Sequence, residues 1–333
     1  MFKQRKLNKQ SSFFIKNLIF VVTVFLYLNT LCAQKLTLID SLIKEEKFRA
    51  AINECIKIIN LEKGIDSLDL GNVLMRKGKC FFLLENRDSS LSAYFTALSI
   101  FEKIKNTRRI AAANSNIADI YHIKGDYQNS KKYYDEAYKN YYELKDPVLL
   151  DRNYNDRAVI LFKLNDVKEA IGLQHNALTQ FASVMTDDMR IRHLMNLGTF
   201  FEPTDRDSSL YYYSRAEKNI LKLKDTTLLS IVYNNMGVIY KQNGDWQKSA
   251  LYLQKSAYLT EHFNNKADEI RIYNNLAEVY DTLGLHQKSN HYYKRVVVLS
   301  EDVFNKEKDK FSSELAEKYE SVKKDERIKA QEI

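Results

Sequence analysis

A pattern that returns at a regular interval of about 40 residues is the feature that most constrains what this 333-residue chain can fold into. The pattern is clearest in residues 233–257, where a small residue, Gly237, stands at its centre. The equivalent positions are Ile39 in a weaker first copy, and then Gly78, Ala118, Ala158, Gly198, Gly237 and Ala277. Recurrence at this length predicts supersecondary units that stack on their neighbours.

Each copy has the residues that two short antiparallel helices need. The missing side chain at Gly237 lets a second helix approach closely, and Tyr240 packs one turn later. Gly244 can adopt the left-handed conformation that ends a helix, and Asp245 can cap the helix that follows. Only two prolines and nine glycines occur in the chain, so few positions interrupt the helices.

The order of these positions resembles the tetratricopeptide repeat, whose pattern W-x2-L-G-x2-Y is followed by A, F and A. The resemblance extends from Leu36 to about Leu299, and it is best at Met236, Gly237, Tyr240, Gly244 and Trp246. Serine replaces the second-helix alanine at Ser90, Ser130, Ser209, Ser249 and Ser289. The resemblance implies an all-α fold, a right-handed superhelical solenoid of about seven helix hairpins in residues 34–300, followed by a long C-terminal helix.

Residues 1–33 have the composition of a secretory signal peptide. Five basic residues precede the apolar run 18–31, and Ala33 offers a small residue for cleavage before Gln34. We therefore expect an exported protein that is periplasmic or associated with the cell envelope. Two alternatives stay open: an uncleaved membrane anchor, although the run is short for a span of about 20 residues, and a lipoprotein attached through Cys32.

The net charge of +8 belongs largely to this segment. The remaining chain has 46 basic side chains against 43 acidic ones, a net charge of +3. No basic patch remains that would favour a nucleic acid as a partner. Two cysteines remain as well, Cys55 and Cys80; both stand at packing positions and are expected to be buried free thiols, with one disulfide as the alternative.

Candidate binding residues lie on the first helix of each unit. In the family, first helices line the concave face, and the residue two places before the small position projects near it. Here that position holds Arg76, Asn116, Asp156, Asn196, Asn235 and Asn275, and Asn155, Asn234 and Asn274 directly precede three of them. An amide carries a donor and an acceptor, so a row of Asn side chains can hold the backbone of an extended peptide. The competing interpretation is that these amides hydrogen-bond between neighbouring helices.

Charged residues of both signs share this face. A solvated surface is the default expectation for all eight, which are Lys79, Asp119, Arg152, Arg192, Lys241, Arg271, Glu278 and Asp281. Arg152, Arg192 and Arg271 are the three that indicate binding of a carboxylate or an acidic peptide.

No motif for catalysis occurs. The six histidines have neither HExxH nor i, i+4 spacing, and the chain has no GxSxG elbow, phosphate-binding loop or Cys-x-x-Cys pair. The sequence therefore predicts no metal site, no cofactor and no enzymatic activity.

The pattern changes after Leu299. One apolar stripe is formed by Phe304, Phe311, Leu315, Ala316, Tyr319 and Val322, and Ala316 lies one repeat length after Ala277. Residues 301–333 are therefore expected to be a capping helix that continues as an exposed helix, with a coiled coil as one form of it. The stretch from Leu315 to Ile328 resembles the segment that leaves the periplasmic repeat array of bacterial membrane sensors, although Ile333 is reached before any apolar run.

The sequence supports two functional hypotheses. The first is a non-enzymatic interaction scaffold in the bacterial cell envelope that binds a protein or peptide partner in its concave groove. The alternative is a truncated sensory module of a membrane two-component histidine kinase or helix-turn-helix transcription regulator. In either case, membrane association would come from an uncleaved signal or from a missing C-terminal span.

Overall fold

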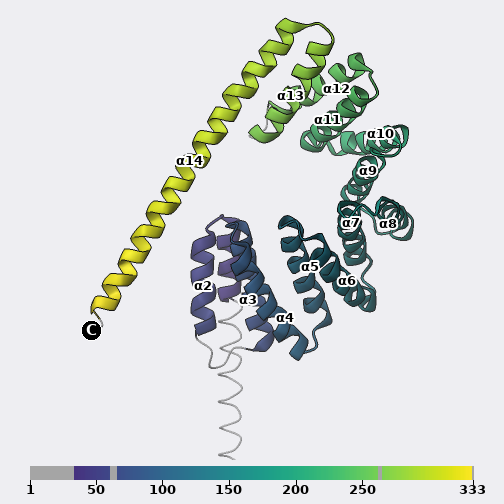
Figure 1. The fold of residues 1–333 in the computed structure, drawn as a ribbon. Coiled ribbons are helices and arrows are strands. Elements are labelled where there is room, and N and C mark those ends of the chain that lie inside the picture. The colour runs from purple at the N-terminus through teal and green to yellow at the C-terminus, as the bar shows by residue number, and fades with distance from the viewer. Residues whose placement is uncertain (1–33, 61–65, 262–264, 332–333) are drawn as a thin grey trace, which may run out of the picture. The chain divides into compact units, whose positions relative to one another are not determined.

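The computed structural model describes residues 34–60, 66–261 and 265–331 (Figure 1). The expected signal peptide, residues 1–33, lies outside the described residues. Within the described ranges the regular secondary structure is helical and no strand occurs, as the repeat pattern predicts.

The helices follow one another at regular intervals along the chain. After a helical segment at 34–44 come α2 (Phe48–Asn60), α3 (Ser67–Leu83), α4 (Arg87–Lys103), α5 (Thr107–Ile123), α6 (Tyr127–Leu144), α7 (Pro147–Lys163), α8 (Val167–Gln180), α9 (Asp187–Phe201), α10 (Arg206–Leu223), α11 (Thr226–Gln242), α12 (Trp246–Thr260), α13 (Lys266–Thr282) and α14 (His286–Gln331). Each odd-numbered helix from α3 to α13 packs against the helix that follows it. Segment 34–44 packs against α2 through Ile39, which completes the expected hairpins.

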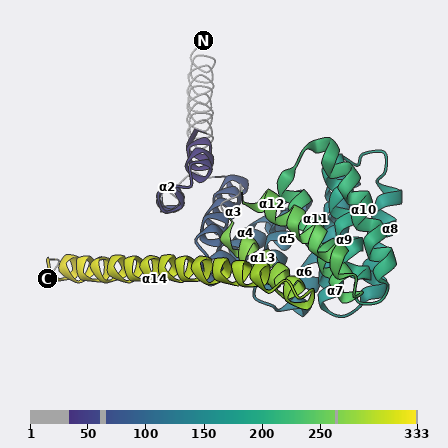
Figure 2. The same cartoon turned by 90° about the horizontal axis from the view of Figure 1, so that it is seen from above.

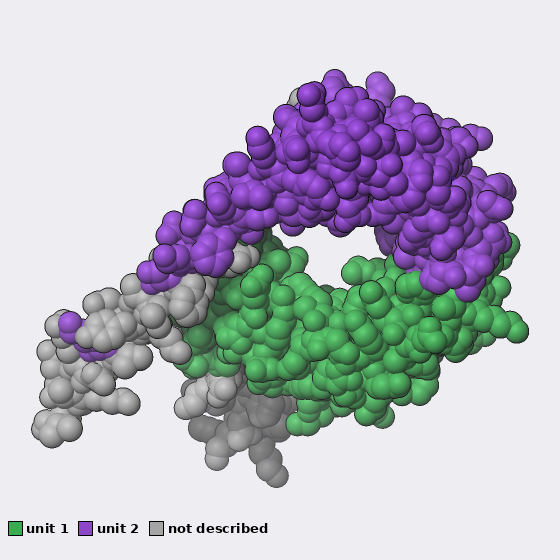
Figure 3. All heavy atoms as spheres, turned by 45° about the horizontal axis from the view of Figure 1, so that its top comes forward, with its two compact units in different colours: residues 1–185 green, residues 186–333 purple. Residues whose placement is uncertain are grey.

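The hairpins form two compact units, residues 1–185 and 186–333, divided between α8 and α9 (Figure 3). Inside each unit, one hairpin packs on the next: α4 on α5 and α6 on α7 in the first unit, α10 on α11 and α12 on α13 in the second. Contacts between neighbours therefore hold each unit together, as in other solenoid repeats.

A capping side chain begins almost every helix. At ten helix starts the N-cap side chain accepts a hydrogen bond from the backbone N–H three residues later: Asn86, Asn106, Asp126, Asp146, Asp166, Thr186, Asp205, Asp225, Asp245 and Asn265. The cap predicted at Asp245 is thereby confirmed. Each such cap contributes about 1 kcal/mol, and together they place the helix starts at regular intervals.

Left-handed residues end several of the helices. Gly244 has a φ of 76° at the end of α11, as predicted. Lys145 and Lys224, with φ of 51° and 56°, end α6 and α10 in the same conformation although they carry side chains. Because the left-handed region costs an L-residue roughly 1–2 kcal/mol, these two turns are strained where Gly244 is not.

The serines that replace alanine on second helices close the hairpins. The hydroxyl of Ser130 donates to the carbonyl oxygen of Ala118 at 2.9 Å. The same bond joins Ser90 to Gly78, Ser209 to Gly198 and Ser249 to Gly237. All of these serines are fully buried, so each hydroxyl finds a partner across the hairpin, as buried polar groups require.

The small residue lies directly beneath the second helix. A Cβ added at Gly237 would lie 2.7 Å from Cγ of Leu253 and 3.2 Å from its backbone nitrogen. One added at Gly198 would lie 2.8 Å from the ring of Tyr213. The close approach predicted from the sequence is confirmed at both positions.

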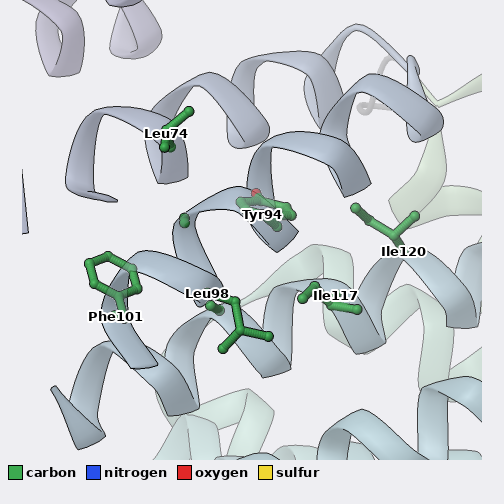
Figure 4. Close-up of a cluster of buried hydrophobic side chains, with 8 residues drawn as sticks. Leu74, Tyr94, Leu98, Phe101, Ile117 and Ile120 are labelled. Atoms are coloured by element: carbon green, nitrogen blue, oxygen red, sulfur yellow. The ribbon is translucent and has the colours of Figure 1, made fainter. Parts of the chain in front are cut away.

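Apolar side chains from consecutive hairpins meet in shared clusters. One buried cluster joins α3, α4 and α5 and includes Leu74, Tyr94, Leu98, Phe101, Ile117 and Ile120 (Figure 4). In the second unit a buried cluster joins α12 to α13, with Trp246 packed against it. These clusters bury the apolar face that a single hairpin would leave exposed.

The last helix, α14, is a single helix of 46 residues (Figures 1 and 2). Its first part packs on the α12–α13 cluster through Tyr292, Val296 and Leu299. The helix then continues past residue 300 without a break. The second helix of the last hairpin and the segment from 301 to Gln331 are therefore one element.

Candidate functional site

The candidate amides and their aspartate lie on the first helices of successive hairpins. Asn116 is on α5, Asn155 and Asp156 on α7, Asn196 on α9, Asn234 and Asn235 on α11, and Asn274 and Asn275 on α13. Asn155 and Asn234 are buried, and the others are half-buried. These side chains are thus enclosed by neighbouring helices to a degree that the sequence did not show.

Three of the amides in the second unit form a continuous hydrogen-bonded row. Nδ2 of Asn235 donates to the hydroxyl of Tyr213 on α10 at 3.1 Å, and Nδ2 of Asn234 donates to Oδ1 of Asn235 at 3.2 Å. Nδ2 of Asn275 donates to Oδ1 of Asn234 at 3.4 Å. We call Asn234, Asn235 and Asn275 the amide row. It links α10, α11 and α13, and therefore crosses from one hairpin to the next.

Both ends of the amide row are held in place. The hydroxyl of Tyr213 lies 2.8 Å from Oγ1 of Thr199, and Nζ of Lys241 donates to Oδ1 of Asn275 at 2.9 Å and to Oε2 of Glu278 at 2.8 Å. These bonds support the inter-helix interpretation of the three amides. A primary amide has two N–H donors and an oxygen with two lone pairs, so among the described residues Asn275 uses one donor and one acceptor site and has one of each left for a ligand.

The first unit places carboxylates at the corresponding positions. The hydroxyl of Tyr134 donates to Oδ1 of Asp119, and Nδ2 of Asn155 donates to Oδ1 of Asp156 at 3.2 Å. Nε of Arg152 lies 3.9 Å from Oδ2 of Asp156. We call Asp119, Tyr134, Arg152, Asn155 and Asp156 the carboxylate cluster.

Burial is the main influence on the acid at the centre of this cluster. It raises the pKa of Asp119, while the hydrogen bond from Tyr134 and the charge of Arg152 oppose that rise. Burial also raises the pKa of the Tyr134 hydroxyl, which therefore stays protonated and acts as the donor. The carboxylate cluster suits a cationic group, whereas the amide row suits a neutral one.

The three arginines lie on the same helix face as the candidate amides. Each is exposed and stands one helical turn before the candidate at position 156, 196 or 275. Arg152 faces Asp156 within α7, and Nη2 of Arg271 donates to Oδ1 of Asp268 at 3.0 Å within α13. Two of the three thus pair with a carboxylate of their own helix, and no described contact joins the three into one site.

Sequence reasoning missed the tyrosines of the second helices. Tyr134 and Tyr213 are buried, and their hydroxyls reach the first helix of their own hairpin at Asp119 and Thr199. Tyr213 also receives the amide of Asn235 from the next hairpin. The available signal was a tyrosine that returns at nearly the same place on the second helix, since Tyr94 occupies it as well.

The cysteines behave as the sequence predicts. Cys55 and Cys80 are free and buried, and burial raises their pKa to about 12 and about 11. Within the described part of the chain, no group of His, Cys, Asp or Glu side chains is arranged to hold a metal ion. No helix in these ranges combines the length and the apolar character needed to cross a bilayer.

Comparisons with known proteins agree with the fold. Tetratricopeptide repeat family models match residues 111–142 and 228–301. No curated protein sequence matches the chain. Among solved structures, a signal transduction ATPase with a tetratricopeptide repeat sensor from Pyrococcus horikoshii is similar with a TM-score of 0.69 at 13% identity; the match covers 82% of this chain and 43% of that protein.

Two Rap structures are similar as well. A Rap protein complexed with competence and sporulation factor has a TM-score of 0.57 at 18% identity, over 80% of this chain and 74% of its own. A Rap conjugation gene regulator in complex with a peptide has a TM-score of 0.54 at 13% identity, over 81% and 74%. At these identities the likeness concerns the fold.

The stacked hairpins define an all-α helical repeat solenoid. The two matched segments lie in the hairpin α5–α6 of the first unit and in the helices from α11 into α14 of the second, so both units contain tetratricopeptide repeats. The resemblance of the stretch from Leu315 to Ile328 to membrane-sensor tails stays a prediction.

Proposed function

We propose that the protein is a non-enzymatic scaffold that binds an extended peptide segment of a protein partner along its first helices. The observation that carries this proposal is the amide row, whose members are linked across hairpins while Asn275 keeps a donor and an acceptor. The similar Rap regulator whose structure contains a peptide supports a peptide as the ligand.

A row of neutral amides favours contacts with peptide backbone over contacts with particular side chains. Backbone N–H and C=O groups recur along any extended chain and match the donor and acceptor of an amide. Side-chain preference would then come from the charged residues of each unit. Within the first unit the carboxylate cluster would select a basic side chain, and within the second unit Arg192 and Arg271 would select acidic ones.

The amide contribution is tested by replacing Asn196, Asn235 and Asn275 together with Ala. The probe is a peptide selected on the parent protein from a phage-displayed random library, and its affinity is measured by fluorescence anisotropy. Each lost neutral hydrogen bond is worth about 0.5–1.5 kcal/mol, so affinity should fall roughly tenfold to a thousandfold. The control variant is Asn176→Ala, which removes an exposed amide from the second helix α8.

Urea unfolding of the same variants separates binding from folding. Because Asn235 and Asn275 bond across hairpins, we expect the triple variant to lose about 1–3 kcal/mol of unfolding free energy. The same peptide with N-methylated backbone amides should bind the parent weakly. Its affinity for the triple variant should equal its affinity for the parent, because the amide contacts are already lost. Unchanged affinity for the triple variant, or full binding of the N-methylated peptide, would remove the amides from the mechanism.

We also propose that the protein is exported and acts in the cell envelope. This rests on the basic segment and apolar run of residues 1–33 and on the cleavage position at Ala33. Sequencing of the mature N-terminus should begin at Gln34. An N-terminus that still begins at Met1 would favour the membrane anchor instead.

The long helix α14 favours a second candidate function, the sensory module of a membrane sensor. A helix of 46 residues that leaves the last hairpin is suited to carry a change from the repeat array to another element. The genomic reading frame beyond the codon for Ile333 tests it. A following segment of about 20 apolar residues is expected under this hypothesis, and a frame without one would count against it.

A further inference from the structure

The second helix of an interior hairpin is covered by the first helix of the next hairpin. Tyr94 and Leu98 of α4, 3% and 8% exposed, share a buried cluster with Ala113 and Ile117 of α5. These two positions lie one turn apart on the same face of α4.

The same arrangement returns in the second unit. Leu253 and Ala257 of α12, 0% and 5% exposed, share a cluster with Ile272 and Leu276 of α13. They stand as far beyond Gly237 as Tyr94 and Leu98 stand beyond Gly78. In both units the apolar pair is thus buried between the first helix of its own hairpin and the first helix of the next one.

The last hairpin has the same apolar positions, but they are exposed. Tyr293 and Val297, one repeat after Leu253 and Ala257, are 41% and 56% exposed, and Phe304 further along α14 is 66% exposed. No described helix covers them. We call Tyr293, Val297 and Phe304 the terminal face. Its composition is that of a surface between hairpins and not that of a solvated cap.

The sequence contains a segment that matches the missing neighbour. Residues 315–319, LAEKY, repeat residues 276–280 of α13, LAEVY, one repeat length later. Helix α14 runs through this segment without a turn. At 1.5 Å per residue, residue 315 is about 33 Å along the helix from residue 293, so the segment cannot cover the terminal face of its own chain.

We propose that a second copy of the chain supplies this segment, so that two copies cap each other through antiparallel α14 helices. In the array, Leu253 and Ala257 share their cluster with Leu276 and Ile272 of the antiparallel α13. One repeat later, the equivalent positions set 293 opposite 315 of the second copy and 297 opposite 311. Both pairs have residue 304 as their midpoint, so a twofold axis passes near Phe304 and the two Phe304 side chains meet there.

Charge along α14 favours the same antiparallel direction. Residues 286–299 contain three basic side chains and no acidic one, whereas residues 300–320 contain seven acidic and four basic ones. An antiparallel pair sets these stretches against each other, while a parallel pair sets like charges side by side. Since Arg295 already pairs with Glu261 at 2.7 Å, the remaining charges select orientation more than they add affinity.

The first test is the mass of the purified chain in solution by light scattering and sedimentation equilibrium. We expect twice the chain mass for the parent. Val297→Glu should shift the dissociation constant upward by at least a hundredfold, because it places a charge in an apolar seam. Val298→Glu is the matched control: Val298 is the next residue, it is 64% exposed, and it lies about 100° around the helix.

The second test identifies the pairing. A Val297→Cys variant and a Phe311→Cys variant, mixed and oxidised, should form a disulfide between chains, because positions 297 and 311 are opposite each other in the proposed pair of helices. Cys55 and Cys80 are buried and stay out of this reaction. Circular dichroism of every variant checks that the helices remain folded.

Several outcomes would overturn the proposal. A parent that is monomeric at all concentrations would leave the terminal face to another protein. A double variant, Val297→Cys with Phe311→Cys, that forms its disulfide within one chain would show that α14 bends to complete an eighth hairpin by itself. A dimer that Val298→Glu dissociates as strongly as Val297→Glu would place the interface on another face of α14.

Discussion

The carboxylate cluster and the amide row occupy the same positions of the repeat with different chemistry. In each, a second-helix tyrosine sends its hydroxyl to the residue that follows the small position, Asp119 for Tyr134 and Thr199 for Tyr213. The next hairpin contributes Asp156 beside the first tyrosine and Asn235 beside the second. The repeat thus determines where polar groups meet, while the residue type at each place determines which ligand group they suit.

The largest loss of stability is expected from a substitution that disrupts the packing beneath the amide row. Gly198→Leu would drive its side chain into the ring of Tyr213, which an added Cβ alone would approach to 2.8 Å. Overpacking of this kind costs typically about 1–3 kcal/mol, and we expect the upper end because Asn235 also loses the Tyr213 hydroxyl. Urea unfolding gives the measurement.

Gly172→Leu is the matched control for this change. Gly172 lies in α8, and a Cβ added there meets no atom within 4 Å. We expect this variant to be as stable as the parent or slightly more stable, because leucine favours helix over glycine. Equal losses at both glycines would show that the close approach at Gly198 is unimportant.

Removal of the two tyrosine hydroxyls should distinguish the two sites. Tyr134→Phe takes a donor from the half-buried carboxyl of Asp119, and hydrogen bonds to charged groups are worth about 1.5–3 kcal/mol. Tyr213→Phe removes neutral contacts with Thr199 and Asn235, worth about 0.5–1.5 kcal/mol each. Thermal and urea unfolding should therefore show a larger loss per hydrogen bond removed for Tyr134→Phe, and a smaller loss per bond there would contradict the assigned charge.

The carboxylate cluster should also give stability a pH dependence. Burial holds the pKa of Asp119 above its unfolded value of about 3.9, so the folded state binds this proton more tightly than the unfolded state does. Its contribution is greatest below about pH 4 and is lost as pH rises through the folded pKa. Asp119→Asn should therefore gain stability relative to the parent as pH rises from about 4 to 7.

Urea midpoints across this pH range provide the check. Glu143→Gln, which removes an exposed carboxylate from α6, serves as the control for net charge. A stability difference between Asp119→Asn and the parent that does not change with pH would mean that the carboxyl is not destabilised by burial.

The smallest expected effect concerns a type of turn that occurs once in each unit, with a left-handed lysine at the end of a helix. Lys145→Gly and Lys224→Gly would each relieve a left-handed lysine at a helix end. The relief of roughly 1–2 kcal/mol is partly offset by the greater freedom of glycine in the unfolded chain. We expect each variant to gain about 0.5 kcal/mol in the free energy of unfolding, measured in urea. A lower free energy of unfolding for either variant would show that its lysine is not strained.

Local signals were sufficient for the hairpins. The small residue at Gly237, the left-handed turn at Gly244 and the cap at Asp245 each act within one or two turns of helix, so their effect could be predicted from spacing. The strained turn at Lys145 could not, because no composition rule selects a lysine for that conformation. Its place between the end of α6 and the Asp146 cap of α7 requires that conformation in spite of its local preference.

The polar site depended on distances that a sequence does not contain. The side chain of Asn234 could contact either a ligand or the side chain of Asn275. Which of the two it contacts depends on the distance between α11 and α13, and the packing between these helices sets that distance. Likewise, Ser249 departs from the alanine of the repeat pattern, yet its hydroxyl donates a hydrogen bond to the carbonyl oxygen of Gly237 and so joins the two helices of the hairpin. The candidate residues were found by their spacing, whereas their partners came only with the structure.

Trp246 makes the two units separately observable. It is the single tryptophan of the chain and packs against the cluster of α12 and α13 in the second unit. Its fluorescence therefore reports the unfolding of that unit, whereas far-ultraviolet circular dichroism reports the helices of both. Because contacts between neighbours hold each unit together, the fluorescence and circular dichroism transitions can have different urea midpoints. A separation between their midpoints would measure how much more stable one unit is than the other.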